Sequence, residues 1–307
     1  MGMIRVEGLT RRFGDRVAVE GLTFEVREGE IVALLGPNGA GKTTTVRMLA
    51  CLISPTSGRA WVGGHEVHAE PEAIRAIVGI LTETPGLYKR LSARQNLRFF
   101  AELYGIQDAR DRIERYLRFF GLWERRDEPV ATYSKGMRQK LALARALLHE
   151  PRVLLLDEPT AGLDPESARS VREFIAGLKG ERRAVLLCTH NLPEAERLCD
   201  RILLLRTRII AQGTPEELKR RLFGTRVVIE LANPRPGIEA ELRLPEVKSA
   251  ELAGARLYVE VSDPHRDNPA LVRRLVELGA EIVSVREEET TLEDVYHELM
   301  GDADAQG

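Results

Sequence analysis

The sequence predicts an α/β fold whose core is a mostly parallel sheet, followed by a smaller α+β unit. Two observations predict the core. Four apolar runs have the length of buried strands and lie between stretches of helical periodicity, at residues 31–36, 153–159, 184–190 and 201–206. The first run leads into a glycine-rich turn, as βα units often do. Such alternation is typical of a parallel sheet with helices on both faces.

Length and composition limit the classes of protein to consider. The chain has 307 residues, enough for about two domains of roughly 150 residues each. The formal net charge of −2 gives no sign of a nucleic-acid partner. No run approaches the roughly 20 apolar residues that span a bilayer, and the three cysteines lack metal-ligand spacing. We therefore expect a soluble cytoplasmic protein with reduced thiols and no nucleic-acid partner.

The elements around the first buried run belong to the same domain. Residues 3–7 and 22–26 have the pattern of short strands joined by a turn, and residues 61–67 fit an edge hairpin. A helix is expected from Lys42 to about Leu52. Residues 92–123 show apolar residues at helical intervals, with an arginine-rich opposite face that we interpret as solvated.

A second, smaller pattern begins after residue 225. Strands are expected at 226–231, 240–245, 256–261 and 281–286, with helices at 268–278 and 291–300. This order predicts a small α+β domain over residues 221–300, attached to a first domain that spans residues 1–220. Residues 301–307 are short, polar and terminal, so we expect a disordered tail.

The glycine-rich turn reads GPNGAGKT over residues 36–43, directly after a buried strand and before a helix. The glycines let successive N–H groups point at one phosphate, Lys42 reaches the β- and γ-phosphates, and the Thr43 hydroxyl binds Mg²⁺. Thr44 adds another donor at the helix start. The sequence therefore predicts a nucleoside triphosphate and Mg²⁺ as ligands, with the nucleotide bound by Gly36, Pro37, Asn38, Gly39, Ala40, Gly41, Lys42, Thr43 and Thr44.

Two acids follow the second buried run, in VLLLDEP. Asp157, at the tip of the strand, can hold Mg²⁺ through its water shell. Glu158 lies where it can accept a proton from the attacking water. The alternative is that both acids only cap a helix, and the phosphate loop upstream makes this alternative weaker.

A second turn suited to anions lies between these motifs. Residues 133–139 read YSKGMRQ, a Ser-Lys-Gly turn that opens a helix, whose unpaired N–H groups carry the positive end of the helix dipole. The chain thus has two turns suited to binding phosphate, although a single phosphate loop is enough to bind one nucleotide.

The order GPNGAGKT, YSKGMRQ, VLLLDEP, AGLD and His190 resembles the ATP-binding subunits of ABC transporters over residues 3–220. The resemblance implies a P-loop NTPase core with an antiparallel β subdomain and a helical subdomain at about 88–150. It also implies that the signature turn binds the γ-phosphate of ATP held by another subunit, in a head-to-tail dimer. The signature residues are Ser134, Lys135, Gly136 and Met137, with Lys135 and Met137 departing from the usual Gly and Gln.

The same resemblance implies roles for single residues. Phe13 stacks on adenine, unless it is a core residue at a strand end. His190 contacts the γ-phosphate, and Asp164 lies in the loop that connects the two ATP sites, where it can also cap a helix. Glu83 occupies the position of a usual Gln that senses Mg²⁺ and water, so the expected metal residues are Thr43, Asp157 and Glu83.

The C-terminal unit, ending in TTLEDVYHELMG, resembles ATP-binding subunits of bacterial drug-exporter-type systems for multidrug, antibiotic or sodium export. This implies a separate membrane permease of about six helices, each of roughly 20 residues, which contacts residues 83–98 and holds the chain at the cytoplasmic face of the membrane. The alternative is a soluble ABC ATPase that acts on a macromolecular complex. The transported substrate, the direction of transport and the choice between homodimer and heterodimer stay open.

Overall fold

The computed structural model describes residues 2–223, 225–242, 244–288 and 291–304. Contacts divide the chain into two units, Met1–Thr214 and Pro215–Gly307. The sequence prediction put this boundary at residue 220. Among the described residues no helix has both the length and the apolar composition needed to cross a membrane.

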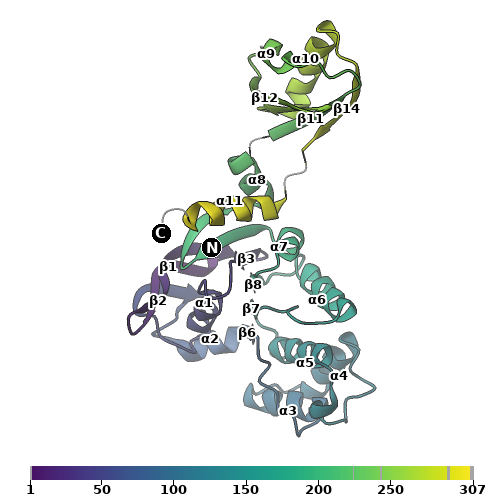
Figure 1. Cartoon of the computed structure of the whole chain (residues 1–307). Helices are drawn as coiled ribbons and strands as arrows, with labels where there is room; N and C mark the ends of the chain where they lie inside the picture. Colours follow the sequence, from purple (N-terminus) through teal and green to yellow (C-terminus); the bar gives the residue numbers. More distant parts are fainter. Residues whose placement is uncertain (1, 224, 243, 289–290, 305–307) are drawn as a thin grey trace. The chain divides into compact units, whose positions relative to one another are not determined.

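The first unit is built around a six-stranded sheet with strand order β10-β9-β3-β8-β7-β6 (Figure 1). Neighbouring strands are parallel from β9 to β6, and only β10 is antiparallel to its neighbour. These pairings confirm the predicted mostly parallel sheet. Its apolar runs are buried, as expected for parallel strands that are covered on both faces. The strands are β3 Ile31–Leu35, β6 Val78–Leu81, β7 Val153–Asp157, β8 Ala184–Thr189, β9 Arg201–Arg206 and β10 Arg208–Gly213.

An antiparallel sheet of order β2-β1-β4-β5 covers one side of this core. Its strands alternate buried and exposed residues, and the buried ones share one apolar core with β3, β7 and β8. Its strands are β1 Gly2–Phe13, β2 Arg16–Arg27, β4 Ser57–Val62 and β5 His65–Glu66. The antiparallel β subdomain that the resemblance implied is therefore present.

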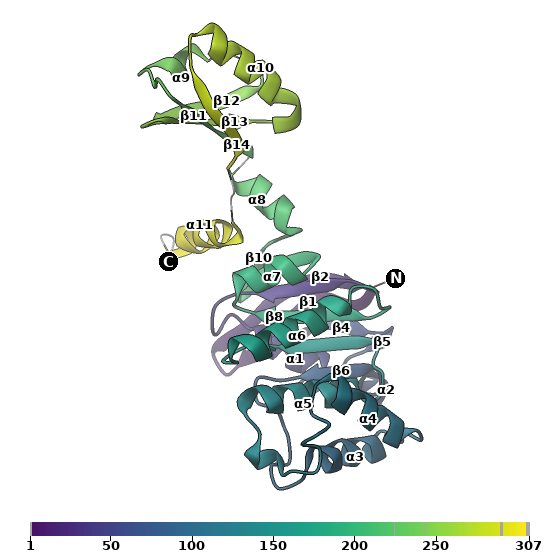
Figure 2. The same ribbon diagram turned by 90° about the vertical axis from the view of Figure 1, so that its right-hand side faces the viewer.

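Helices complete the first unit. Four of them flank the sheets: α1 Lys42–Leu49, α2 Pro71–Ile77, α6 Pro165–Gly177 and α7 Leu192–Leu198. Three others pack on one another at one end of the unit, as Figure 2 shows: α3 Ala93–Leu103, α4 Ala109–Phe119 and α5 Lys135–Leu147. These three form the helical subdomain.

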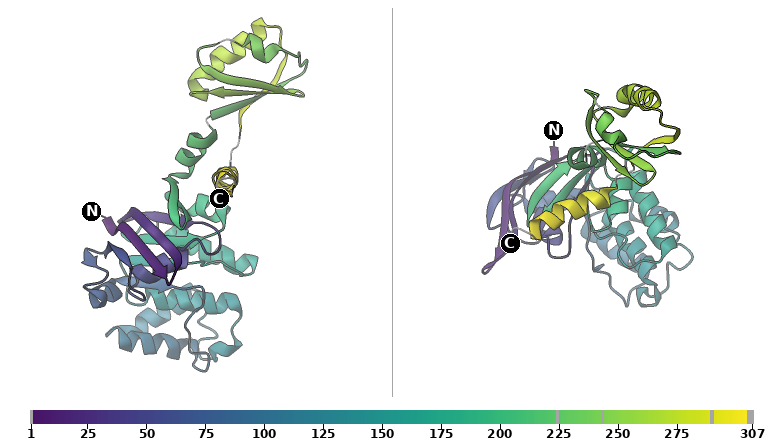
Figure 3. Two further views of the ribbon diagram at one scale, coloured as in Figure 1. Left: turned by 60° about the vertical axis from the view of Figure 1, so that its left-hand side comes forward. Right: turned by 45° about the horizontal axis from the view of Figure 1, so that its top comes forward.

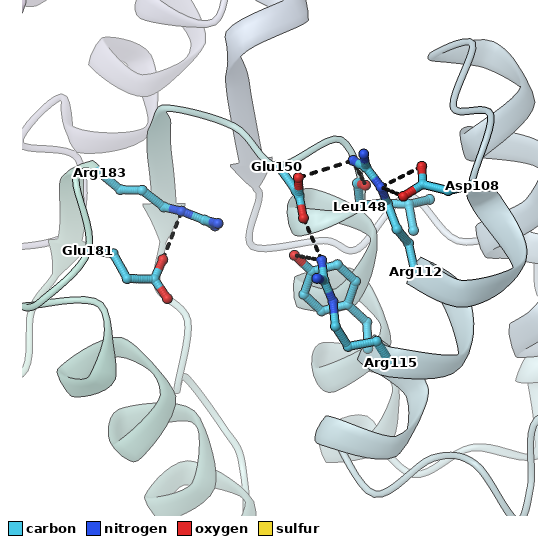
Figure 4. A network of polar contacts seen from close by, with 8 residues as sticks. Asp108, Arg112, Arg115, Leu148, Glu150, Glu181 and Arg183 are labelled. Carbon is cyan, nitrogen blue, oxygen red and sulfur yellow. Dashed lines mark hydrogen bonds and ion pairs between the residues drawn. The ribbon is translucent and has the colours of Figure 1, made fainter.

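Ion pairs fasten α4 to the connection between α5 and β7 (Figure 4). Glu150 accepts from Arg115 at 2.6 Å and pairs with Arg112 at 3.5 Å, while Arg112 also binds Asp108 at 2.8 Å. Arg112 further donates to the Leu148 carbonyl at 3.4 Å. The hydrogen bond from Arg115 lowers the pKa of Glu150, so these pairs are charged at neutral pH. The network joins helix α4 of the helical subdomain to the segment that leads into strand β7 of the parallel sheet.

The second unit contains a four-stranded antiparallel sheet of order β12-β13-β11-β14, with α9 and α10 on one face (Figure 3). Apolar residues of the strands and of α10 form its core. A pair of helices, α8 and α11, contact each other. The elements are α8 Pro215–Phe223, β11 Thr225–Leu231, α9 Ile238–Glu241, β12 Val247–Ala253, β13 Arg256–Val261, α10 Pro264–Glu277, β14 Ile282–Glu287 and α11 Leu292–Asp304.

One strand prediction in this unit is wrong. None of the described residues within 240–245 lies in a strand, because α9 continues to Glu241 and Leu242 is buried in the core. The strand is instead β12, whose sequence VKSAELA has no continuous apolar run. The tail predicted at residues 301–307 begins inside α11, and residues 305–307 lie outside the described residues.

Candidate active site

The phosphate loop connects β3 to α1 and depends on its glycines. Gly41 has φ 105°, and a Cβ there would lie 2.5 Å from the Ala18 carbonyl oxygen. A Cβ on Gly36 would lie 2.2 Å from the Leu205 carbonyl oxygen. Helix α1 has no side-chain cap, so its first N–H groups are free to bind an anion. The local sequence thus builds a backbone cradle for phosphate.

A pocket opens over this loop, and its wall combines distant segments. From the predicted set it contains Phe13, Pro37, Asn38, Gly39, Gly41, Lys42, Thr43, Thr44, Glu83, Glu158 and His190. Gly36, Ala40 and Asp157 are not part of the wall. Phe13 is 47% exposed, so it is not a core residue, and its ring lies under the Arg11 guanidinium.

Three wall residues were missed by the sequence analysis: Arg16, Ala18 and Ala161. Ala18 and Ala161 carry no chemical signal that a sequence can reveal. Arg16 does carry such a signal, because its guanidinium group can bind a phosphate. It comes directly after the turn that follows Phe13. The position of that turn beside the phosphate loop is a tertiary feature.

Lys42 is 6% exposed and its ammonium group is held in place by oxygen atoms. Its Nζ donates to the Gly36 and Pro37 carbonyls at 2.6 and 3.2 Å and lies 3.4 Å from Glu158 Oε1. A buried ammonium with these partners forms a fixed positive charge at the base of the pocket.

Glu158 is held in an unusual backbone conformation. Its φ of 49° lies in the left-handed region, which non-glycine residues seldom adopt. Its N–H donates to the Cys188 carbonyl at 2.9 Å, and its Oε2 lies 2.9 Å from His190 Nδ1. The carboxylate therefore sits between Lys42 and His190, with the three residues coming from α1 and from the ends of β7 and β8.

Asp157 is fully buried, and neither of its carboxylate oxygens has a hydrogen-bond partner. Burial raises its pKa, and the charges of Glu158 and Glu83 act in the same direction, while Thr43 and Lys42 oppose it. An unpaired buried carboxylate beside a threonine hydroxyl suits a hard cation that takes oxygen ligands.

The signature turn lies on another part of the first unit, and none of its residues is in the pocket wall. Ser134 caps α5, with its Oγ accepting from the Met137 N–H at 3.1 Å. Ser134 and Lys135 are exposed, whereas Gly136 is buried so closely that a Cβ would lie 2.2 Å from Ser167 Oγ.

Asp164 belongs to the surroundings of the signature turn. Its Oδ1 accepts from the Ser167 N–H at 2.9 Å, which caps α6 and lowers the pKa of Asp164. Its Oδ2 would lie 3.3 Å from a Cβ on Gly136. Asp164 is therefore a helix cap, and it also lies beside the signature turn.

Comparisons with known proteins agree with this geometry. The ABC transporter family model matches residues 19–161. The daunorubicin resistance ATP-binding protein DrrA3 of Streptomyces coeruleorubidus is 40% identical over 97% of this chain and 96% of its own length. The chain belongs to the ABC transporter ATP-binding proteins. It is therefore an ATP-binding subunit of the ABC ATPase class, and such subunits work with membrane permeases.

The likeness of this ABC protein to its relatives includes both units. A model of the C-terminal domain of DrrA1-3-like ATP-binding proteins matches residues 213–300, which confirms the predicted drug-exporter-type C-terminal unit. The Nod factor export ATP-binding protein I of Ralstonia nicotianae is 37% identical over 85% of this chain and 82% of its own. A solved ATP-binding subunit of an ABC transporter has a TM-score of 0.67 and 37% identity, over 72% of this chain and 93% of that one.

Proposed function

We propose that the chain binds ATP in a head-to-tail dimer, with each ATP held between the phosphate loop of one subunit and the signature turn of the other. The observation that carries this proposal is the separation of the two turns. The signature turn begins with the exposed Ser134 and Lys135, outside the wall of the pocket. An anion on this turn would therefore belong to another molecule. A closed two-fold pair satisfies both turns at once.

Within one subunit, the phosphate loop and Lys42 bind the phosphates, and Phe13 stacks on the adenine. The exposure of Phe13 in the pocket wall supports this role. From the partner, Ser134 and Gly136 donate to the γ-phosphate, and Asp164, packed beside Gly136, connects the two sites. Lys135 and Met137 complete that turn.

For hydrolysis, Glu158 accepts a proton from the attacking water and His190 contacts the γ-phosphate. The 2.9 Å contact between these side chains supports their acting together. Thr43, Asp157 and Glu83 would hold Mg²⁺, which neutralises charge on the phosphates when bound. The unpaired oxygens of Asp157 support this assignment. A positioned base of this kind contributes about 10²–10⁴-fold in rate.

The energy of hydrolysis drives export through a separate permease of about six helices of roughly 20 residues, at the cytoplasmic face of the membrane. The relatives named for daunorubicin resistance and Nod factor export support the direction. Exposed aromatic and apolar side chains on α3 and in the segments next to it support a docking surface there. They are Tyr88, Phe99, Leu103 and Tyr104.

Co-purification from the native host tests this function. The tagged chain is extracted from membranes in mild detergent, and its partners are identified by mass spectrometry. We expect one polytopic membrane protein in stoichiometric amount. Phe99→Asp should release it, whereas Phe119→Asp, another exposed phenylalanine of the helical subdomain, should not. Ribosomal proteins or no membrane partner would favour the soluble alternative.

A further inference from the structure

Glu194, in the first turn of α7, is a buried acid to which the mechanism above gives no role. It is only 2% exposed. Its Oε1 accepts from the Thr160 hydroxyl at 2.8 Å, and its Oε2 accepts from the Thr189 hydroxyl at 3.0 Å. One carboxylate thus joins two loops that leave neighbouring strands of the parallel sheet.

These two loops carry Glu158 and His190. Thr160 follows Glu158 by two residues, and Thr189 directly precedes His190. The Asn191 N–H donates to the Thr189 hydroxyl at 3.0 Å, which directs the hydroxyl proton of Thr189 towards Glu194. The clamp formed by Thr160, Glu194 and Thr189 therefore links the chain next to Glu158 with the chain next to His190.

Burying the Glu194 carboxylate in this clamp costs free energy. Burial raises the pKa of Glu194, and the two threonine hydroxyls and the charge of Arg172 only partly offset this. An apolar side chain would fill the same space without placing an acid in the core. A buried carboxylate with both oxygens satisfied instead fixes the geometry of the groups that donate to it.

A second buried hydrogen bond holds the same loop and comes from helix α5. Gln139 of α5 is 5% exposed, and its Nε2 donates to the Pro159 carbonyl at 2.9 Å. The loop after Glu158 is thus held at Pro159 by Gln139 of α5 and at Thr160 by Glu194.

We propose that Glu194 is a positioning residue for ATP hydrolysis, which locks the loop of Glu158 against the loop of His190 through Thr160 and Thr189. The inference rests on the roles proposed above for Glu158 and His190. Glu194 does not touch the reacting atoms, so its removal should lower kcat and leave ATP binding intact.

Steady-state ATPase assays on the full chain test this role. Glu194→Ala should lower kcat by about tenfold or more and change the KM for ATP by less than about twofold, because only the transition-state geometry is lost. Glu194→Gln should recover part of kcat, since it keeps one acceptor and the Thr160 hydroxyl can turn to accept from its amide. Glu173→Gln, an exposed acid on α6, is the matched control and should behave as the wild type.

Thr160→Val covers the case in which Glu194→Ala fails to fold, because it removes only one hydroxyl of the clamp. It should lower kcat in the same way, and the double variant Glu194→Ala/Thr160→Val should be no worse than the poorer single variant. Glu158→Gln is measured in parallel. If Glu158→Gln is inactive while Glu194→Ala, Glu194→Gln and Thr160→Val keep kcat within about twofold, the clamp is overturned and the proposed function stands. Full turnover by Glu158→Gln overturns the proposed function itself.

Discussion

The two turns for phosphate in this chain are built differently. Helix α1 begins at Lys42, after Gly41 and without a side-chain cap, and the Lys42 ammonium group is buried among carbonyl oxygens. Helix α5 is capped by Ser134, and Ser134 and Lys135 face solvent. The phosphate loop is therefore a cradle within one subunit, whereas the proposed function makes the signature turn one wall of a site that a second molecule completes. On that proposal, two turns of similar chemistry act in cis and in trans according to what surrounds them.

The largest expected difference is between two variants that each lose the lysine of one turn. Lys42→Ala should weaken ATP binding by about 2–5 kcal/mol, because it removes a buried charge that pairs with phosphate. Lys135→Ala should leave ATP binding by the isolated subunit unchanged, since Lys135 is exposed and outside the pocket. Titration of each variant with a fluorescent ATP analogue measures both. Equal losses in the two variants would show that the turns are not different.

Ser134→Arg tests the signature turn directly. The large cation should block closure on the partner's ATP and lower kcat by about tenfold or more, with the KM for ATP little changed. The loss of the cap costs about 1 kcal/mol, which a thermal melt will reveal.

A mixture of two inactive variants tests whether one ATP site is shared between two subunits. An equimolar mixture of Ser134→Arg and Lys42→Ala should regain activity, with about a quarter of the wild-type number of intact sites if subunits pair at random. A mixture as inactive as its parts would contradict a site shared between two copies of this chain.

Glycine substitutions compare the packing of the two turns. Gly41→Ala should destabilise the protein more than Gly136→Ala, because Gly41 combines a left-handed φ with a backbone clash at Ala18. At Gly136 the clash is with the Ser167 side chain, and overpacking of this kind costs about 1–3 kcal/mol. Chemical denaturation measures both, and Ser167→Gly should rescue only Gly136→Ala.

The smallest expected effect is on stability and comes from Asp157. Its pKa is raised on folding, so the folded chain binds this proton more tightly than the unfolded chain does. Without Mg²⁺, stability should fall as the pH rises from the ordinary range of an aspartate through the raised pKa. Asp157→Asn should remove this fall and raise the melting temperature at neutral pH, by roughly 2–4 °C for each kcal/mol. It should also abolish stabilisation by Mg²⁺. A lower melting temperature would contradict the account of an unpaired buried charge.

The sequence predicted the elements whose signal is local. The buried strands follow from continuous apolar runs, and the phosphate loop follows from glycine spacing. Strand β12 was missed because Lys248, Ser249 and Glu251 interrupt its apolar residues, and the core instead accepts Leu242, the residue after α9. Arg16 and Glu194 were missed for another reason. Glu194 stands in LPEAERL, where an acid in the first turn of a helix is ordinarily exposed. Its burial depends on tertiary packing, which brings Thr160, 34 residues earlier in the chain, to its carboxylate.

The central claim is that the signature turn completes the ATP site of a second subunit. Its most direct test is the molar mass of Glu158→Gln in solution, measured by light scattering with and without ATP, beside the double variant Glu158→Gln/Ser134→Arg. The account predicts a dimer only when ATP is present and Ser134 is intact, and a monomer that still binds ATP in the double variant. An ATP-bound monomer of Glu158→Gln, or a dimer indifferent to Ser134→Arg, would contradict it.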